Sequence, residues 1–249
     1  MTKILLSGAN GKMGNVIRGI VSERDDCEIV AGVDINTLST DFPVYSNIKD
    51  VKETADVIVD FSNPAALQSL IDYSKENAVP LVIATTGYSE EQKNAIKEAS
   101  QYSPIFFTYN MSIGINLLVN LAKKAVSVLG DDFDVEIVEK HHNQKIDAPS
   151  GTALMLADAI AEEKENKVNY EFNRHSKREK RPKDEIGLHS IRGGTIVGEH
   201  DVMFCGKDEI ITLSHSARSK EIFAVGAIKA ALYMSGKPAG MYDMSNIVE

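Results

Sequence analysis

The sequence is poor in cysteine and proline, has no tryptophan and carries no excess of positive charge. Its two cysteines, Cys27 and Cys205, form no CxxC pair, so we expect neither a disulfide framework nor a metal site. Lysine and arginine number 27 against 36 acidic residues, a formal charge of −9, which argues against a nucleic-acid partner. No apolar run approaches the roughly 18 residues of a membrane helix, and the apolar stretch after Met1 is too short for a signal peptide. These shortages predict a protein of the reducing cytoplasm that binds neither membrane nor nucleic acid.

What the chain does contain is the composition of a folded globular protein. It has 249 residues, 43% of them hydrophobic and 25% charged, which suits one large or two small domains. The first part alternates helical segments with short apolar runs at 3–7, 28–33, 56–61, 81–85 and 105–108. Apolar strands without polar alternation are typical of a parallel sheet covered by helices on both faces. We therefore predict a doubly wound, Rossmann-type α/β domain.

The pattern changes after residue 110. A helix that Gly130 ends is expected to bury one stripe, made of Leu117, Leu118, Leu121, Ala125 and Leu129. An alternating strand at 133–137 and later runs at 186–192, 195–204 and 210–216, with glycine turns at 193–194 and 206–208, predict an open mixed or antiparallel sheet. A small-residue helix at 222–234 is assigned back to the first domain. The predicted domains are 1–111 with 218–249, and an α+β domain at 112–217.

A strongly charged segment lies within the second domain, at 162–185. It contains six closely spaced basic residues, Arg174, Lys177, Arg178, Lys180, Arg181 and Lys183. Such a run is most often a solvated loop, and the alternative is a basic contact to a substrate or cofactor.

A glycine-rich turn joins the first predicted strand to the first helix. It reads Gly8-Ala9-Asn10-Gly11-Lys12-Met13-Gly14, with the spacing GxxGxxG. Glycines at this place let backbone N–H groups approach a pyrophosphate at the helix N-terminus, where the helix dipole favours anions. A plain strand-to-helix turn is the alternative, but the position after the N-terminal strand favours dinucleotide binding.

The residue that ends the second strand bears on the choice of cofactor. Asp34 lies 20 residues after Gly14, where a carboxylate accepts hydrogen bonds from an adenosine ribose and repels a 2′-phosphate. NADH should therefore be preferred. Lys12, which could also be a solvated helix-start lysine, could accommodate the extra phosphate of NADPH, so use of both cofactors is our hypothesis.

The most informative stretch runs from Glu139 to Ala153, with the sequence EKHHNQKIDAPSGTA. The adjacent His141 and His142 leave a strand on opposite sides, which suits separate roles better than one shared metal ion. Lys145 follows at a distance that can bring its ammonium back beside one imidazole. The first amides of the helix that starts at Gly151 and Thr152 would form an anion site suited to a carboxylate. Taken singly, each has a structural alternative: a core histidine, a surface lysine, an ordinary helix cap.

This stretch resembles the signature E-x-H-H-x-x-K-x-D-A-P-S-G-T-A of the 4-hydroxy-tetrahydrodipicolinate (dihydrodipicolinate) reductases. The resemblance extends to the glycine turn and to segments 60–62, 85–87, 110–116, 198–200 and 235–237. It implies NAD(P)H-dependent reduction of 4-hydroxy-tetrahydrodipicolinate, via dehydration to dihydrodipicolinate, to tetrahydrodipicolinate in diaminopimelate and lysine biosynthesis. It also implies a homotetramer built through the second-domain sheets, which would cover the open sheet face.

The resemblance further implies roles for individual residues. His141 corresponds to the proton donor and Lys145 to a second acid or electrostatic partner, while His142, Gly151 and Thr152 correspond to contacts with the carboxylates of a small dicarboxylate heterocycle. Cofactor contacts fall on the turn and on three further places, namely Gly8, Ala9, Asn10, Gly11, Lys12, Met13, Asp34, Ala84, Thr85, Thr86, Thr108, Tyr109, Asn110 and Met111. Ala84 replaces a glycine of the family pattern, and Thr108-Tyr109 replaces two alanines.

Three other functions explain the sequence less completely than the reductase does. Another two-domain amino-acid dehydrogenase would explain the first domain but not the cluster of His, Lys and Ser-Gly-Thr. A nicotinamide-sensing regulator would need a DNA-reading module, which neither the charge nor any helix-turn-helix pattern supplies. A metal hydrolase using His141, His142 and Asp147 is disfavoured by the adjacent histidines and the lack of HExxH.

Overall fold

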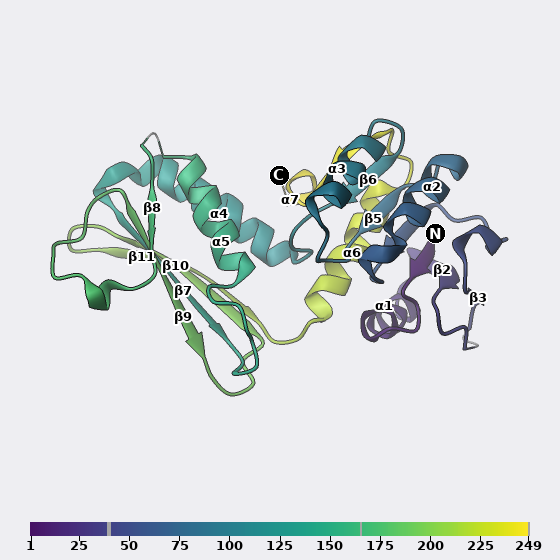
Figure 1. The fold of residues 1–249 in the computed structure, drawn as a ribbon, viewed down its shortest axis with the longest axis horizontal. Helices are drawn as coiled ribbons and strands as arrows, with labels where there is room; N and C mark the ends of the chain where they lie inside the picture. The colour runs from purple at the N-terminus through teal and green to yellow at the C-terminus, as the bar shows by residue number, and fades with distance from the viewer. Residues whose placement is uncertain (39–40, 165, 249) are drawn as a thin grey trace. The chain divides into compact units, whose positions relative to one another are not determined.

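The computed structural model describes residues 1–38, 41–164 and 166–248. The chain divides into two compact units, Met1–Ile113 with Glu221–Glu249, and Gly114–Lys220. Figure 1 traces both along the chain.

The first unit is built on a seven-stranded, fully parallel sheet. Its strand order is β12-β6-β5-β4-β1-β2-β3. The strands are β1 (Thr2–Ser7), β2 (Cys27–Val33), β3 (Val44–Tyr45), β4 (Val57–Asp60), β5 (Leu81–Ile83), β6 (Pro104–Phe107) and β12 (Gly240–Tyr242). The connections are α1 (Lys12–Ser22), α2 (Leu67–Asn77), α3 (Glu90–Ala99), α6 (Glu221–Met234) and α7 (Ser245–Val248), with short 3-10 helices η1 (Ile48–Asp50) and η2 (Pro64–Ala66). The doubly wound parallel sheet predicted from the apolar runs is confirmed.

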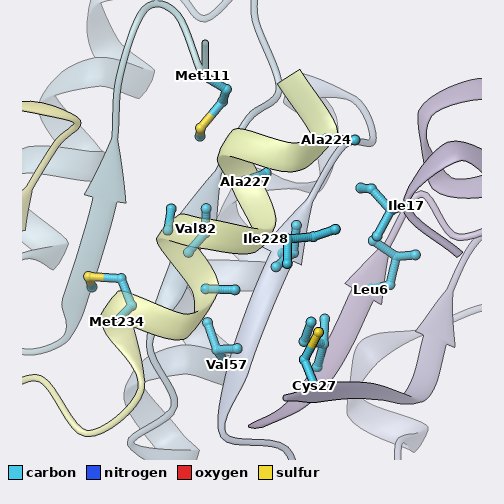
Figure 2. Close-up of a cluster of buried hydrophobic side chains, with 14 of the residues drawn as sticks. Leu6, Ile17, Cys27, Val57, Val82, Met111, Ala224, Ala227, Ile228 and Met234 are labelled. Atoms are coloured by element: carbon cyan, nitrogen blue, oxygen red, sulfur yellow. The ribbon is translucent and has the colours of Figure 1, made fainter. Parts of the chain in front are cut away.

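Each face of this sheet has its own core. Alternate strand residues such as Leu6 and Val59 pack with α1 and α6, whereas their neighbours Leu5 and Ile58 pack with α2 and α3. Figure 2 shows the first of these clusters, in which Ala227, Ile228 and Met234 of α6 line the core. The strands are therefore buried on both sides, which is why their sequences are apolar without alternation.

Local sequence signals explain several of the boundaries. A capping box opens α3, where the Ser89 side chain accepts from the backbone N–H of Gln92 and the Gln92 side chain accepts from the backbone N–H of Ser89. Asn63 caps the turn η2 that leads into α2. In α6, a Cβ on Gly226 would lie 1.7 Å from the carbonyl oxygen of Met111, so a side chain there would push the helix away.

The second unit holds a five-stranded mixed sheet in the order β11-β10-β7-β9-β8. Its strands are β7 (Asp134–His141), β8 (Asn169–Glu171), β9 (Glu185–Arg192), β10 (Gly198–Cys205) and β11 (Ile210–Ala217). Strand β10 runs antiparallel to β7 and β11, whereas β9 runs parallel to β7 and β8. Helices α4 (Ile113–Leu129) and α5 (Gly151–Glu162) pack on one face, and η3 (Gly130–Asp132) and η4 (Arg174–Ser176) are short turns. The mixed sheet predicted for this part of the chain is confirmed.

Two details of that prediction are wrong. The glycines at 193–194 do not form the turn of a hairpin, because β9 and β10 do not pair with each other. These two strands lie on opposite sides of β7, and the segment between them crosses the end of β7. The buried residues of α4 are Ile115, Leu118, Ala122 and Val126, while Leu117 and Leu121 are about half exposed (46% and 45%). The helix is apolar nearly all round, so its sequence does not single out the buried stripe.

Helix α4 also bears on the membrane expectation. Together with the turn after it, the segment Ile113–Asp132 is long and apolar enough to cross a membrane by length and composition alone. The expectation that no segment reaches this length is therefore wrong. The inner side of the helix packs into the same hydrophobic cluster as β7, which is the packing of a core helix.

The charged segment 162–185 is tied to the second sheet by several ion pairs. Arg181 donates to Asp134 at 2.8 Å, to Glu136 at 3.0 Å and to the carbonyl oxygen of Val135 at 2.9 Å. Arg174 pairs with Glu185, and Lys177 with Glu171. Part of the positive charge that stands out in the sequence is thus neutralised within the unit.

Candidate functional site

The carboxyl edge of the parallel sheet in the first unit gathers the segments predicted to hold a cofactor. Because all its strands run the same way, the ends of β1, β2, β4, β5 and β6 meet at this edge. The chain beyond them carries Gly8–Met13, Asp34, Ser62, Thr85 and Thr108–Met111 respectively. In open α/β sheets, ligands bind in the crevice outside this edge, where the strand order reverses, here between β1 and β4.

The glycine turn fits a pyrophosphate on geometric grounds. Gly8 has a φ of 80°, and a Cβ on it would lie 2.4 Å from the carbonyl oxygen of Phe61. A Cβ on Gly14 would lie 2.2 Å from the carbonyl oxygen of Gly8, so the turn can close tightly only with glycines. Gly11 is the N-cap of helix α1 and makes no side-chain cap, and the first turn of the helix contains no acidic residue. Its N-terminus therefore keeps the character of an anion site.

Asp34 holds this turn in place. Its Oδ2 accepts from the backbone N–H of Asn10 at 2.9 Å, and its Oδ1 accepts from the N–H of Asn36 at the same distance. The carboxylate thus lies directly beside the turn, at the end of β2, where the ribose of a dinucleotide is bound in Rossmann domains. Lys12 is exposed at the start of α1.

The loops after β4, β5 and β6 complete this edge. Thr85 accepts a hydrogen bond from the Ser62 N–H at 2.9 Å, which joins the loop after β5 to the loop after β4. Ala84 donates to the carbonyl oxygen of Asp60 at 2.9 Å. Burial raises the pKa of Asp60, which lies beneath both loops and bonds to Ser62. Thr86 is exposed, as is Tyr109 beyond β6, which is 72% exposed and packs its ring against Phe107.

The second unit brings the predicted catalytic stretch together at the end of β7. His141 is the last residue of the strand and is 9% exposed, on the face that the helices cover. His142 follows outside the strand, and its Nδ1 is buried without a hydrogen-bond partner among the described residues. The ammonium of Lys145 pairs with Asp147 at 2.8 Å. These placements agree with separate surroundings for the two histidines.

Helix α5 begins just beyond this stretch. Ser150 is its N-cap and accepts from the Ala153 N–H at 3.1 Å, and no acidic residue lies in the first turn, which Gly151 and Thr152 open. The Ser150 hydroxyl also lies 2.9 Å from Nε2 of His200 on β10. The helix start is therefore fixed from two sides, with its positive dipole end left for an anion.

A buried carboxylate links His141 to that helix. Glu139, fully buried two residues earlier on β7, lies 2.6 Å from Nδ1 of His141 and accepts from the Ser150 N–H at 3.1 Å. Arg192 at the end of β9 binds both carboxylate oxygens, at 2.7 and 2.6 Å. Burial alone would raise the pKa of Glu139, but hydrogen bonds from Arg192 and His141 outweigh it and lower this pKa to about 2. The carboxylate is thus charged at any ordinary pH.

His200 lies against the other side of His141. The two rings meet edge to face with centroids 5.2 Å apart. Burial, reinforced by the charge of His141, lowers the pKa of His200 to about 4, so this ring is neutral at neutral pH. No cluster of three potential metal ligands occurs within residues 1–38, 41–164 and 166–248.

Sequence reasoning assigned no role to three members of this network, Glu139, Arg192 and His200, although the first opens the signature stretch and the last lies in the segment 198–200 of the resemblance. Glu139 could have been found, because residues two apart on a strand share a face and His141 was already a candidate. The roles of Arg192 and His200 could not, because Arg192 lies 53 residues after Glu139 and His200 lies 59 residues after His141, and no local pattern fixes the order of their strands.

Comparison with known proteins gives concordant results over the whole chain. Family models described as the N-terminus and C-terminus of dihydrodipicolinate reductase match residues 2–111 and 114–248. A 4-hydroxy-tetrahydrodipicolinate reductase of Caldanaerobacter subterraneus subsp. tengcongensis is 52% identical over 249 residues, covering 100% of this chain and 99% of the relative. The reductase of Staphylococcus aureus is 49% identical over 247 residues, covering 98% and 100%.

Solved structures agree with this result. A dipicolinate-bound dihydrodipicolinate reductase from a Paenisporosarcina species superposes with a TM-score of 0.82 at 27% identity, covering 99% of both chains. An aspartate dehydrogenase from Thermotoga maritima has a TM-score of 0.51 at 11% identity, covering 96% of this chain and 98% of its own, and shares the fold alone.

Proposed function

The chain belongs to the dihydrodipicolinate reductase family, and from this premise we propose how its residues carry out the nicotinamide-dependent reduction of 4-hydroxy-tetrahydrodipicolinate in diaminopimelate and lysine biosynthesis. The observation that supports the proposal is the network in which Glu139 joins His141 to the start of α5. It sets a proton-carrying ring beside a helix N-terminus within one unit. A small dicarboxylate whose ring gains negative charge on hydride addition needs a proton donor for the ring and an anion site for a carboxylate.

The substrate is proposed to bind at the start of α5. The backbone at Gly151 and Thr152, at the positive end of the helix dipole, would hold one carboxylate, and the half-buried His142 would contact it as well. Lys145 would keep a positive charge close to the developing anion. These contacts fix the position of the heterocycle, so that the proton donor meets one atom of it.

His141 is proposed to donate the proton. Its Nδ1 is engaged by Glu139, so Nε2 is the nitrogen that exchanges a proton with the substrate. A bound nicotinamide supplies the hydride, and the protein supplies placement and charge.

The cofactor is proposed to bind along the carboxyl edge of the first unit. The proposed contacts come from the glycine turn, the end of β2 and the loops after β5 and β6, namely Gly8, Ala9, Asn10, Gly11, Lys12, Met13, Asp34, Ala84, Thr85, Thr86, Thr108, Tyr109, Asn110 and Met111. The tight closure of the turn around Gly8 and Gly14 supports this placement.

We propose that NADH is preferred and that NADPH is also used. The Asp34 carboxylate beside the turn would repel a 2′-phosphate, while the exposed Lys12 offers it partial compensation. In Asp34→Asn, kcat/KM for NADPH relative to NADH should rise at least tenfold, and in Lys12→Gln it should fall. Dual use is refuted if the unaltered protein shows no turnover with NADPH.

Steady-state kinetics of two variants test the catalytic assignment. His141→Gln and Lys145→Ala should each lower kcat by about 10²–10⁴-fold, the range typical of a lost general acid. KM for NADH should stay unchanged, because neither residue belongs to the cofactor unit. Near-normal kcat in both variants would reject the assignment.

Association into a homotetramer and a cytoplasmic location are further proposals. Helices cover one face of the second sheet, and β11 at its edge exposes Ile210 (61%). Pairing of these sheets between copies would cover the remaining face. Light scattering should give four times the mass of 27.2 kDa. Both cysteines are free, as expected in a reducing compartment, and cell fractionation tests the location.

A further inference from the structure

Glu139 is the most heavily bonded buried carboxylate near the proposed proton donor. It accepts from the guanidinium of Arg192, from the imidazole of His141 and from the backbone of Ser150, and no part of its side chain is exposed. We propose that Glu139 is a positioning residue that locks His141 in one tautomer, with the proton on Nδ1 and Nε2 turned to the substrate. This inference rests on the proposed role of His141 and adds a residue to it.

The tautomer follows from the hydrogen-bond chemistry. An ionised carboxylate can only accept, so the nitrogen 2.6 Å from Glu139 Oε2 must carry a proton in both the neutral and the charged ring. The other nitrogen then gains and loses the exchangeable proton. Nε2 lies near Gly198, where a Cβ would stand only 3.1 Å away, so glycine at this place keeps the nitrogen clear.

Arg192 keeps the carboxylate in its ionised form. Its Nη1 and Nη2 donate to the two carboxylate oxygens of Glu139. Nη2 also donates to the carbonyl oxygen of Asp147 at 2.7 Å. The pKa of Glu139 is held at about 2, as described above, so the proton of His141 is not lost to its neighbour. Glu139 therefore orients the ring and balances its charge without exchanging a proton itself.

The charged and titratable groups around His141 come from three strands and one loop. They are Glu139 on its own strand, Arg192 on β9, His200 on β10 and the ion pair of Lys145 with Asp147 in the loop after β7. Glu139 is the carboxylate that contacts the ring, whereas Asp147 pairs with Lys145. Removal of its charge leaves the guanidinium of Arg192 without its carboxylate partner, and a positive charge on the imidazole of His141 then has no negative group in contact with it.

The same carboxylate also fixes the helix that would hold the substrate. Its Oε1 accepts from the N–H of Ser150, the residue that caps α5. One side chain therefore sets both the orientation of the imidazole and the position of the anion site. This explains why a charged group is kept fully buried here, where an apolar residue would cost less to bury.

The test is Glu139→Gln, which keeps the size of the side chain and removes its charge. We expect kcat to fall about 10- to 100-fold, with KM for NADH changed less than about twofold. The fall of kcat/KM with rising pH, which reports the donor in the free enzyme, should move to lower pH by about one unit or more. In ¹⁵N NMR spectra, unaltered His141 should carry its proton on Nδ1, and the variant should show a mixture of tautomers.

A double variant separates positioning from folding. Glu139→Gln leaves the Arg192 charge unpaired and can destabilise the unit, so Glu139→Gln with Arg192→Met removes both charges. This pair should recover thermal stability while kcat stays low. The matched control is Glu136→Gln on the opposite face of β7, where Glu136 makes a similar set of contacts, to His189 at 2.8 Å and to Arg181 at 3.0 Å. The control should keep the kcat and the pH profile of the unaltered protein.

Three outcomes would overturn the inference. They are unaltered kcat in Glu139→Gln, recovery of kcat together with stability in the double variant, and a proton on Nε2 of His141 in the unaltered protein at a pH where the ring is neutral. Absence of turnover in the unaltered protein would instead refute the proposed function. The NMR spectrum reads the tautomer without turnover, so the two failures are distinguishable.

Discussion

The buried His200 should make the protein sensitive to mild acid. Its side chain is 4% exposed, and burial lowers its pKa from the ordinary 6.5 to about 4. Between these two values the unfolded chain binds a proton that the folded chain does not, so stability falls as the pH decreases. One such histidine lowers the free energy of unfolding by about 2 kcal/mol between pH 7 and pH 5, and by about 3 kcal/mol between pH 7 and pH 4.

His200→Gln removes the titrating ring and keeps a polar group near Ser150. Urea unfolding followed by circular dichroism at pH 7, 6 and 5 should show the variant losing about 2 kcal/mol less than the unaltered protein over this range. Other titrating groups contribute equally to the variant and to the unaltered protein, so they cancel when the two pH dependences are subtracted. Glu139 does not affect this comparison either, because its lowered pKa changes the stability mainly below about pH 4.5. The exposed His175→Gln is the control and should follow the unaltered protein. Parallel pH dependence of His200→Gln and the unaltered protein would refute the reasoning.

Further predictions concern local geometry. Gly14→Ala should abolish NADH binding measured by fluorescence titration, because the added Cβ would lie 2.2 Å from the carbonyl oxygen of Gly8. Gly19→Ala is the control and should bind NADH normally, because a Cβ at Gly19 would have no atom within 4 Å. Gly19→Ala should also raise the free energy of unfolding by about 0.5–1 kcal/mol, because alanine favours the helix. Arg181→Met should cost about 2 kcal/mol in urea unfolding, because the guanidinium binds two carboxylates of β7. Ser89→Ala should cost about 1 kcal/mol by removing the α3 cap, and an unchanged midpoint would contradict this.

Local patterns carried most of the fold prediction because the relevant physics is local. Burial on both faces leaves the parallel strands of the first unit apolar throughout, and the cap at Ser89 is readable from four consecutive residues. Strand β7 alternates between buried and half-buried residues along its length, as its sequence predicted. The glycines of the first turn were recognisable because the backbone approaches so closely there that a residue with a Cβ would clash.

The rest depended on contacts between distant segments. The side of β7 on which β9 and β10 pair is set by how the whole sheet assembles, which a glycine-rich turn does not reveal. Helix α4 is apolar around most of its circumference, so only the packing shows that Leu118 is buried and Leu117 is not. In the site, His141 and Lys145 were visible within one stretch, whereas Arg192 reaches Glu139 from another strand.

The return of α6 to the first unit has a consequence for synthesis on the ribosome. This helix contributes buried residues, among them Ala224, Ile228 and Met234, to one face of the parallel sheet. All strands of that sheet except β12 precede Ile113 in the chain. The ribosome adds about 5–20 residues per second, so translation of the intervening unit Gly114–Lys220 takes roughly 5–20 s. During this time the apolar face of the sheet that α6 later covers stays exposed. Nascent chains should therefore engage chaperones during this interval, and a premature stop codon before Glu221 should yield products that proteases remove.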